Sequence, residues 1–196
     1  MQNSKYLMAL LSVLLTAAAT PNHNAYARSA RTADIKTVVA EGQLTGSDYV
    51  NDYFRVTVHI PQPNTWEKIN TIVDTDRAQL LEAVNAKGPR EQRHNFAIIV
   101  HSSNIPGLRS IAQYVRSVRH MYEREGLETV TNEVAVKYAG HQFVQSILVN
   151  DDPGERSYKG ISCTMLNDYI FGFWVEGANE AEVQRLLNLD ARLKFW

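Results

Sequence analysis

The side chains best suited to metal binding in this sequence are six histidines and a few clustered acids. No His-x-x-x-His or His-Glu-x-x-His spacing occurs, so no helix would present two histidine ligands on one side. The acidic turn at Asp151, Asp152 and Glu155 has too few alternating oxygen ligands for an EF-type calcium loop. We therefore predict no metal site, and one long-range alternative stays open, in which His59, His101 and Asp152 meet in the folded chain.

Nucleophilic side chains are present but lack catalytic spacing. His101 is followed by Ser102 and Ser103, yet neighbouring residues on a strand do not face each other, and no Gly-x-Ser-x-Gly elbow occurs. The one cysteine, Cys163, lies in the alternating segment Ile161–Met165, which predicts a buried, unreactive thiol. Because glycine-rich phosphate-binding patterns are absent as well, we predict no catalytic residue and no cofactor. A small metal-dependent or His/Ser hydrolase is the alternative.

One helix carries a basic face. Apolar residues recur at three- and four-residue steps in Leu108–Arg124, which predicts an amphipathic helix. Arg109, Arg116 and Arg119 are seven and three residues apart, so they share one side and could hold an acidic partner. Nearby Glu123 dilutes this charge, as on an ordinary solvated helix face. We take the three arginines as the candidate partner-binding face, with the solvated face as the alternative.

Five aromatic residues gather near the C-terminus: Tyr158, Tyr169, Phe171, Phe173 and Trp174. Aromatic residues on strands more often build a core than line a pocket. We interpret them as core, and a carrier of a small apolar ligand is the alternative. Between them, Gly172 has no side chain to pack, which indicates the close approach of a covering element or a large neighbour.

The first 27 residues have the features of a secretory signal. Lys5 precedes the apolar run Tyr6–Ala19, and Ala25-Tyr26-Ala27 fits the small-x-small cleavage rule. The run is short for a membrane span, which needs about 20 residues. We predict cleavage after Ala27, a periplasmic or secreted protein, and no stable membrane span after cleavage. An uncleaved membrane anchor is the alternative.

The composition predicts one globular domain. The chain has 196 residues, of which 44% are hydrophobic and 21% charged, enough for one core and short for two. Removing residues 1–27 takes away one lysine and no acid, so the net charge changes from −1 to −2. This near-neutral balance gives no electrostatic reason to expect nucleic acid as a partner. A single cysteine excludes an internal disulfide framework.

Hydrophobic periodicity predicts an α+β fold: an antiparallel β-sheet sandwiched between helices. A flexible N-terminal arm is expected over residues 28–46 and the folded domain over 47–196. The predicted strands are Tyr49–Ile60, His94–His101, Val130–Tyr138, Gln142–Val149, Glu155–Leu166 and Tyr169–Glu176, the last two joined by Asn167-Asp168. The predicted helices are Ile72–Ala86, Leu108–Arg124 and a C-terminal helix capped by Asn179.

Both ends of this pattern resemble the PsbP-like fold family. At the start, strand Phe54–Ile60 leads to Pro61 and then Trp66. At the end, a strand with Tyr158 and the aromatic strand Tyr169–Trp174 precede a helix that closes on Leu193–Phe195. The resemblance covers most of the chain after Tyr49 and implies an antiparallel sheet between helical layers.

The PsbP-like family includes photosystem II extrinsic subunits, a nuclear-transport factor and secreted bacterial proteins of unknown role. This chain is most similar to the uncharacterised secreted bacterial members. The resemblance implies that it acts by binding rather than by catalysis. We therefore expect a secreted or periplasmic, non-enzymatic binding or accessory domain for a protein or a cell-envelope component.

Overall fold

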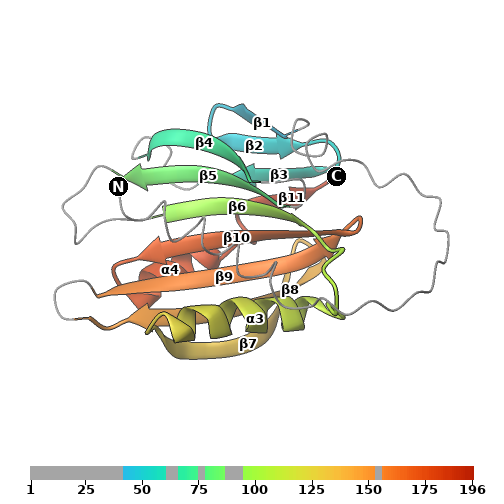
Figure 1. Cartoon of the computed structure of the whole chain (residues 1–196). Coiled ribbons are helices and arrows are strands. Elements are labelled where there is room, and N and C mark those ends of the chain that lie inside the picture. Colours follow the sequence, from blue (N-terminus) through green and yellow to red (C-terminus); the bar gives the residue numbers. More distant parts are fainter. Residues whose placement is uncertain (1–41, 61–65, 75–77, 87–94, 153–155) are drawn as a thin grey trace.

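The computed structural model describes residues 42–60, 66–74, 78–86, 95–152 and 156–196, which form two antiparallel sheets and two helices (Figure 1). The predicted signal segment 1–27 lies outside the described residues. The four-stranded sheet has the order β1 (Gly42–Thr45), β2 (Asp48–Asn51), β3 (Val56–His59) and β11 (Leu193–Phe195). The seven-stranded sheet has the order β4 (Trp66–Asp74), β5 (Ala78–Ala86), β6 (Asn95–Ser102), β10 (Tyr169–Gly177), β9 (Ser157–Leu166), β8 (His141–Asn150) and β7 (Glu128–Tyr138). The described residues therefore form a mixed structure of mostly antiparallel strands with two helices, which agrees with the predicted α+β class at this coarse level.

The centre of the large sheet is strand β10, between β6 and β9. Side chains on both of its faces are buried, as the unbroken run of apolar residues predicts. Strands β7 to β10 follow one another as an antiparallel meander, so the four consecutive strands predicted after the long helix are confirmed. The turn between β9 and β10 places Asn167 and Asp168 at φ 47° and 64°, the left-handed conformation that two-residue hairpin turns require.

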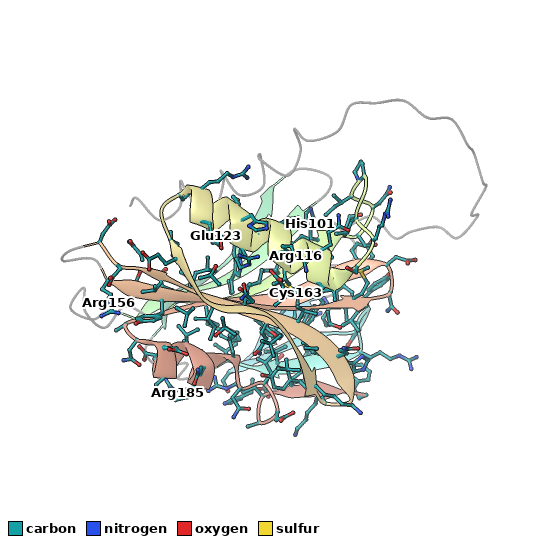
Figure 2. All side chains as sticks on the ribbon, turned by 90° about the horizontal axis from the view of Figure 1, so that it is seen from below. His101, Arg116, Glu123, Arg156, Cys163 and Arg185 are labelled. Carbon is teal, nitrogen blue, oxygen red and sulfur yellow. The ribbon has the colours of Figure 1, made fainter. Side chains whose placement is uncertain are left out.

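The two faces of the large sheet have different covers. Helix α3 (Ile111–Arg124) packs on one face, where Val115 and Val118 meet residues of β6, β8, β9 and β10. Helix α4 (Glu180–Leu187) packs on the other face and shares it with the four-stranded sheet. Figure 2 shows α3 and α4 on opposite sides of the strands. The sheet is therefore covered by a helix on one side and by a helix with a second sheet on the other.

Both helices begin at a side chain that accepts a backbone hydrogen bond. Ser110 caps α3 by accepting from the backbone N–H of Gln113 at 3.2 Å. Asn179 caps α4 as predicted, accepting from the N–H of Glu182 at 3.0 Å, and the Glu182 carboxylate accepts from the N–H of Ala178. This reciprocal pair fixes the start of α4 directly after β10.

The predicted helix Ile72–Ala86 is wrong, because its described residues, 72–74 and 78–86, lie in strands β4 and β5, which pair over most of their length. Its leucine spacing fits a helical stripe, but Ile69, Thr71 and Val73 are β-branched and favour a strand. Pairing of β5 with β6 extends the sheet, so tertiary contacts decide the outcome.

The first predicted strand and the predicted arm also need correction. Tyr49–Ile60 is not one strand: β2 and β3 are separated by a turn in which Arg55 has φ 50° and donates its N–H to the carbonyl of Asp52. These strands build the smaller sheet rather than the large one. Strand β1 lies within the predicted flexible arm 28–46, so that assignment is wrong for residues 42–45, and residues 28–41 lie outside the described residues.

Candidate functional site

The predicted basic face lies where helix α3 crosses the edge strand β7. Arg119 donates from Nε to Oε1 of Glu133 at 2.8 Å, and Arg116 donates from Nε to Oε2 of the same carboxylate at 3.3 Å. Arg119 is buried, and its Nη1 also donates to Glu123. Figure 2 shows Arg116 and Glu123 on helix α3. We call Arg116, Arg119, Glu123 and Glu133 the α3–β7 cluster.

The charges of the α3–β7 cluster stabilise one another. Hydrogen bonds from Thr129 and His120 lower the pKa of Glu123 to about 2, with a further contribution from Arg119. Burial raises the pKa of Glu133, but hydrogen bonds from the two arginines outweigh it and lower that pKa overall. The bond to Glu133 raises the pKa of Arg119. The cluster therefore holds fixed charges at neutral pH and acts as a clamp between α3 and β7.

The three predicted arginines have different surroundings and therefore different roles. Arg119 is internal, because its guanidinium is engaged by two carboxylates. Arg116 keeps 55% of its side chain exposed, and within the described residues its hydrogen bond uses Nε alone. Arg109 is exposed just before the helix, where its backbone N–H donates to the Gln113 side chain. Arg116 is thus the arginine of the clamp best placed to meet a partner.

The strand beside this clamp has an open edge. Among the described strands, β7 pairs with β8 on one side only, and it is the last strand of the large sheet. Its ladder with β8 is irregular between Thr129 and Val134 and regular from Val134 to Tyr138. Val130 and Val134 are 38% and 44% exposed, although both are apolar. An exposed edge with apolar side chains is a template for pairing with another chain.

The histidines weighed for catalysis or metal binding do not come together. His101 is buried under α3, and its Nδ1 lies 3.4 Å from the hydroxyl of Tyr114. Burial lowers the pKa of His101 to about 4. His59 is on the small sheet, exposed, with Nδ1 2.8 Å from Oδ1 of Asp48. Asp152 follows β8 at the end of the large sheet opposite His101, as the strand registers require. Among the described residues, no three potential metal ligands cluster.

The hydrogen bonds of Ser102 and Ser103 hold the loop after β6 and do not involve the imidazole of His101. Ser103 donates from its hydroxyl and its backbone N–H to the carbonyl of Asp168, which ties the β6–α3 loop to the β9–β10 turn. Ser102 accepts from the N–H of Asn104 at 3.3 Å. This arrangement holds the loop in place and leaves no serine against His101 within the described residues.

Cys163 is buried, as predicted, and burial raises the pKa of its thiol. Its Sγ occupies the space over Gly172 on the neighbouring strand, because a Cβ added there would approach Sγ to 2.5 Å. The close neighbour of Gly172 is therefore a cross-strand thiol. Figure 2 places Cys163 in the sheet layer beneath α3.

The aromatic residues weighed as a ligand pocket pack into the two cores. Tyr169, Phe171 and Phe173 lie in the core under the small sheet. Phe171 and Phe173 meet edge to face with 5.5 Å between their ring centres, and Tyr169 meets Phe54 edge to face at 5.9 Å. Trp174 belongs to the opposite core, where its ring is 5.9 Å from Tyr122. Tyr158 is half-buried at the margin of the first core. The core interpretation of these aromatic residues therefore agrees with their packing.

Two residues at this place were not singled out from the sequence: Glu133, which belongs to the cluster, and Thr129, which binds it. Thr129 donates its hydroxyl to Glu123, and Glu133 bridges two arginines. The one available signal was charge: Glu133 is the only acidic residue of the predicted strand Val130–Tyr138, and it is close in sequence to the basic helix.

In the part of the chain that the structure describes, no helix has the length and apolar character needed to cross a membrane. A scan against protein-family models gives no match, and no curated protein matches the chain significantly.

Proposed function

We propose that this chain is a secreted or periplasmic, non-enzymatic binding domain with a PsbP-like fold, and that it binds an extended, acidic segment of a protein partner along β7. The observation that carries the proposal is the open edge of β7 next to Arg116. An added strand would satisfy the outward backbone groups of β7, and a carboxylate on it would meet the remaining donors of Arg116.

The clamp supports this role by making the edge rigid. Arg119 and Arg116 hold Glu133, which lies at the end of the irregular part of β7, and so fix the strand before its regular part begins at Val134. A preorganised strand loses less conformational entropy when a partner pairs with it. The exposed Val134 would then be covered by the added strand.

The proposed PsbP-like fold rests on the antiparallel sheet and on the helices at its two faces. The resemblance implied a helix closing on Leu193–Phe195, but this segment is strand β11, which pairs with β3. Trp66 likewise begins strand β4. The proposed fold therefore includes a second sheet that the resemblance did not imply.

An affinity capture from a cell-envelope extract tests the function. The wild-type chain is compared with Val134→Lys, which places a charge on the open edge. Met165→Lys is the matched control, because Met165 is 43% exposed and Val134 44%. We expect a protein that the wild type and Met165→Lys retain and Val134→Lys loses at least tenfold. Equal retention by all three chains, or no retained protein, would contradict the proposal.

A further inference from the structure

The side chains of β7 alternate between two faces with different chemistry. Glu133 lies on the α3 face, where Arg116 bonds to it. The ladder with β8 is regular over Val134–Tyr138, so every second residue after Glu133 shares that face. These residues are Ala135 and Lys137, and both are exposed. The α3 face of the edge therefore presents a small side chain between two cations, those of Arg116 and Lys137.

The opposite face of the same edge is apolar. Val134, Val136 and Tyr138 share it, and Val136 and Tyr138 pack against the core under the small sheet. The ring centre of Tyr138 lies 5.6 Å from that of Phe143, and the Tyr138 hydroxyl accepts from the side-chain amide of Gln145 at 2.7 Å. Val134 is left 44% exposed at the end of this apolar row. Apolar side chains on an added strand would extend the row and cover Val134.

The outward backbone groups of β7 belong to residues of the α3 face. Tyr138 pairs with His141 across a two-residue turn whose residues have φ of 46° and 87°. Residues that flank such a turn exchange both backbone hydrogen bonds, and bonded and non-bonded pairs then alternate along an antiparallel ladder. The N–H and C=O groups of Ala135 and Lys137 therefore point away from β8, toward the open edge.

The two cations set the spacing of charges on an added strand. Residues directly opposite each other on paired strands point to the same face. Glu133 and Lys137 are four residues apart, which corresponds to about 13 Å along the strand. The charge of Glu133 is already compensated by Arg116 and Arg119, so a carboxylate opposite Glu133 meets the donors that Arg116 does not use within the described residues. A second carboxylate, four residues away on the added strand, meets Lys137.

We propose that β7 selects a five-residue segment with acidic residues at its first and fifth positions and apolar residues at its second and fourth. The acids meet Arg116 and Lys137, and the apolar residues cover Val134 and extend the row at Val136. The third residue lies opposite Ala135, whose small side chain leaves room for a larger one. This pattern reads the same in both chain directions, so it holds for parallel and antiparallel pairing. The inference rests on the proposed β7 interaction and adds the sequence pattern that the partner carries.

NMR titration of the full chain with two capped peptides tests the pattern. The first contains Glu-Val-Thr-Val-Glu between serines. The second contains Glu-Glu-Thr-Val-Val, which has the same composition but places acidic and apolar groups on both faces. We expect the first peptide to shift the amide signals of Ala135 and Lys137 and to bind at least tenfold more tightly than the second. Equal affinities would overturn the pattern.

A charge exchange tests the contact with Lys137. Lys137→Glu should weaken binding of the Glu-Val-Thr-Val-Glu peptide at least tenfold, and it should bind Glu-Val-Thr-Val-Lys more tightly than the wild type does. Lys194→Glu is the matched control, because Lys194 is an exposed lysine on a strand of the small sheet, and it should bind both peptides as the wild type does. If the exchanged pair gains no affinity, the assignment of Lys137 is wrong.

The variant Val134→Lys separates failure of the pattern from failure of the β7 interaction. Equal binding of the two peptides that is lost in Val134→Lys would leave the β7 interaction in place and refute the sequence pattern. Binding of neither peptide, or binding that Val134→Lys leaves unchanged, would contradict both. A wild-type dimer that Val134→Lys converts to a monomer would make a second copy of the chain the occupant of the edge and would likewise refute the proposal.

Discussion

Arg119 and Glu133 are separated by 14 residues in sequence but joined by a 2.8 Å hydrogen bond between α3 and β7. Their side chains are only 11% and 12% exposed, so solvent screens this ion pair little. Removal of Arg119 leaves the buried Glu133 with only the 3.3 Å hydrogen bond from Arg116. The pair therefore links the helix to the edge strand on which the proposed binding depends.

Breaking this pair should destabilise the fold measurably. We expect Arg119→Ala to lower the free energy of unfolding by about 2–3 kcal/mol, because buried charge-assisted hydrogen bonds are lost and Glu133 keeps only its longer bond from Arg116. Urea unfolding measures the change. Arg124→Ala, at an exposed position of the same helix, should change stability by about 0.5 kcal/mol or less. Similar losses in the two variants would show that the clamp contributes nothing specific.

Acid should weaken the clamp in a defined range of pH. The pKa of Glu123 is lowered from 4.5 to about 2 in the folded chain, first by the hydrogen bond from Thr129. The folded carboxylate is thus harder to protonate, and its contribution is present above pH 4.5 and lost as the pH falls towards 2. NMR titration of the Glu123 side chain checks the midpoint. A midpoint at 4.5, or no shift of it in Thr129→Val, would refute this prediction.

Protonation of His101 should lower the free energy of unfolding at a higher pH than protonation of Glu123 does. Burial lowers its pKa from 6.5 to about 4, so the unfolded chain binds a proton between these values and the folded chain does not. The contribution of neutral His101 to the free energy of unfolding is fully present above pH 6.5. It declines as the pH falls towards 4, by about 3 kcal/mol in total. Urea unfolding over this range should show a smaller decline for His101→Leu than for wild type. His59→Gln, at an exposed position, should keep the wild-type decline; equal slopes in all three chains would argue against the burial effect.

Gly172 should tolerate no side chain. A Cβ there would lie 2.5 Å from Sγ of Cys163 and 2.7 Å from the carbonyl oxygen of Ser162. The backbone oxygen cannot move aside easily, so Gly172→Ala should destabilise the chain by about 1–3 kcal/mol. Thermal unfolding measures this. Combining it with Cys163→Ala should recover part of the loss and not all of it, and full recovery would show that Ser162 is not a steric limit.

Export and cleavage remain predictions that one measurement can check. Mass spectrometry of the protein from the producing cells should find a mature chain that begins at Arg28, because Ala25 and Ala27 fit the cleavage rule. A chain that retains Lys5 in the mature fraction would contradict the proposed compartment.

The sequence predicts the elements whose patterns are local. The strand around Phe96–Val100 and the β7–β10 meander follow from apolar runs or alternation ended by turn residues such as Asn167 and Asp168. The α4 cap follows from the position of Asn179. Strands β4 and β5 were missed, because leucines at helical spacing compete with β-branched residues and only pairing with β6 resolves the conflict.

The candidate sites were less predictable because their partners are distant in sequence. The spacing of Arg116 and Arg119 indicates a shared face, but not that Glu133 lies beneath it, since the irregular ladder of β7 decides which way that side chain points. The spacing of arginines in the sequence can therefore predict a basic helix face, but it cannot show which arginines are paired with carboxylates in the folded chain.

The central claim is that a partner binds along the open edge of β7, and site-specific photo-crosslinking tests it most directly. A photoreactive residue replaces Val134 on β7 in one chain and Met165 on β9 in another, since the two positions are equally exposed. In the native envelope, we predict a covalent adduct at position 134 that is weakened by Arg116→Gln, and little or none at position 165. Absence of an adduct at 134, or equal yields at both positions, would contradict it.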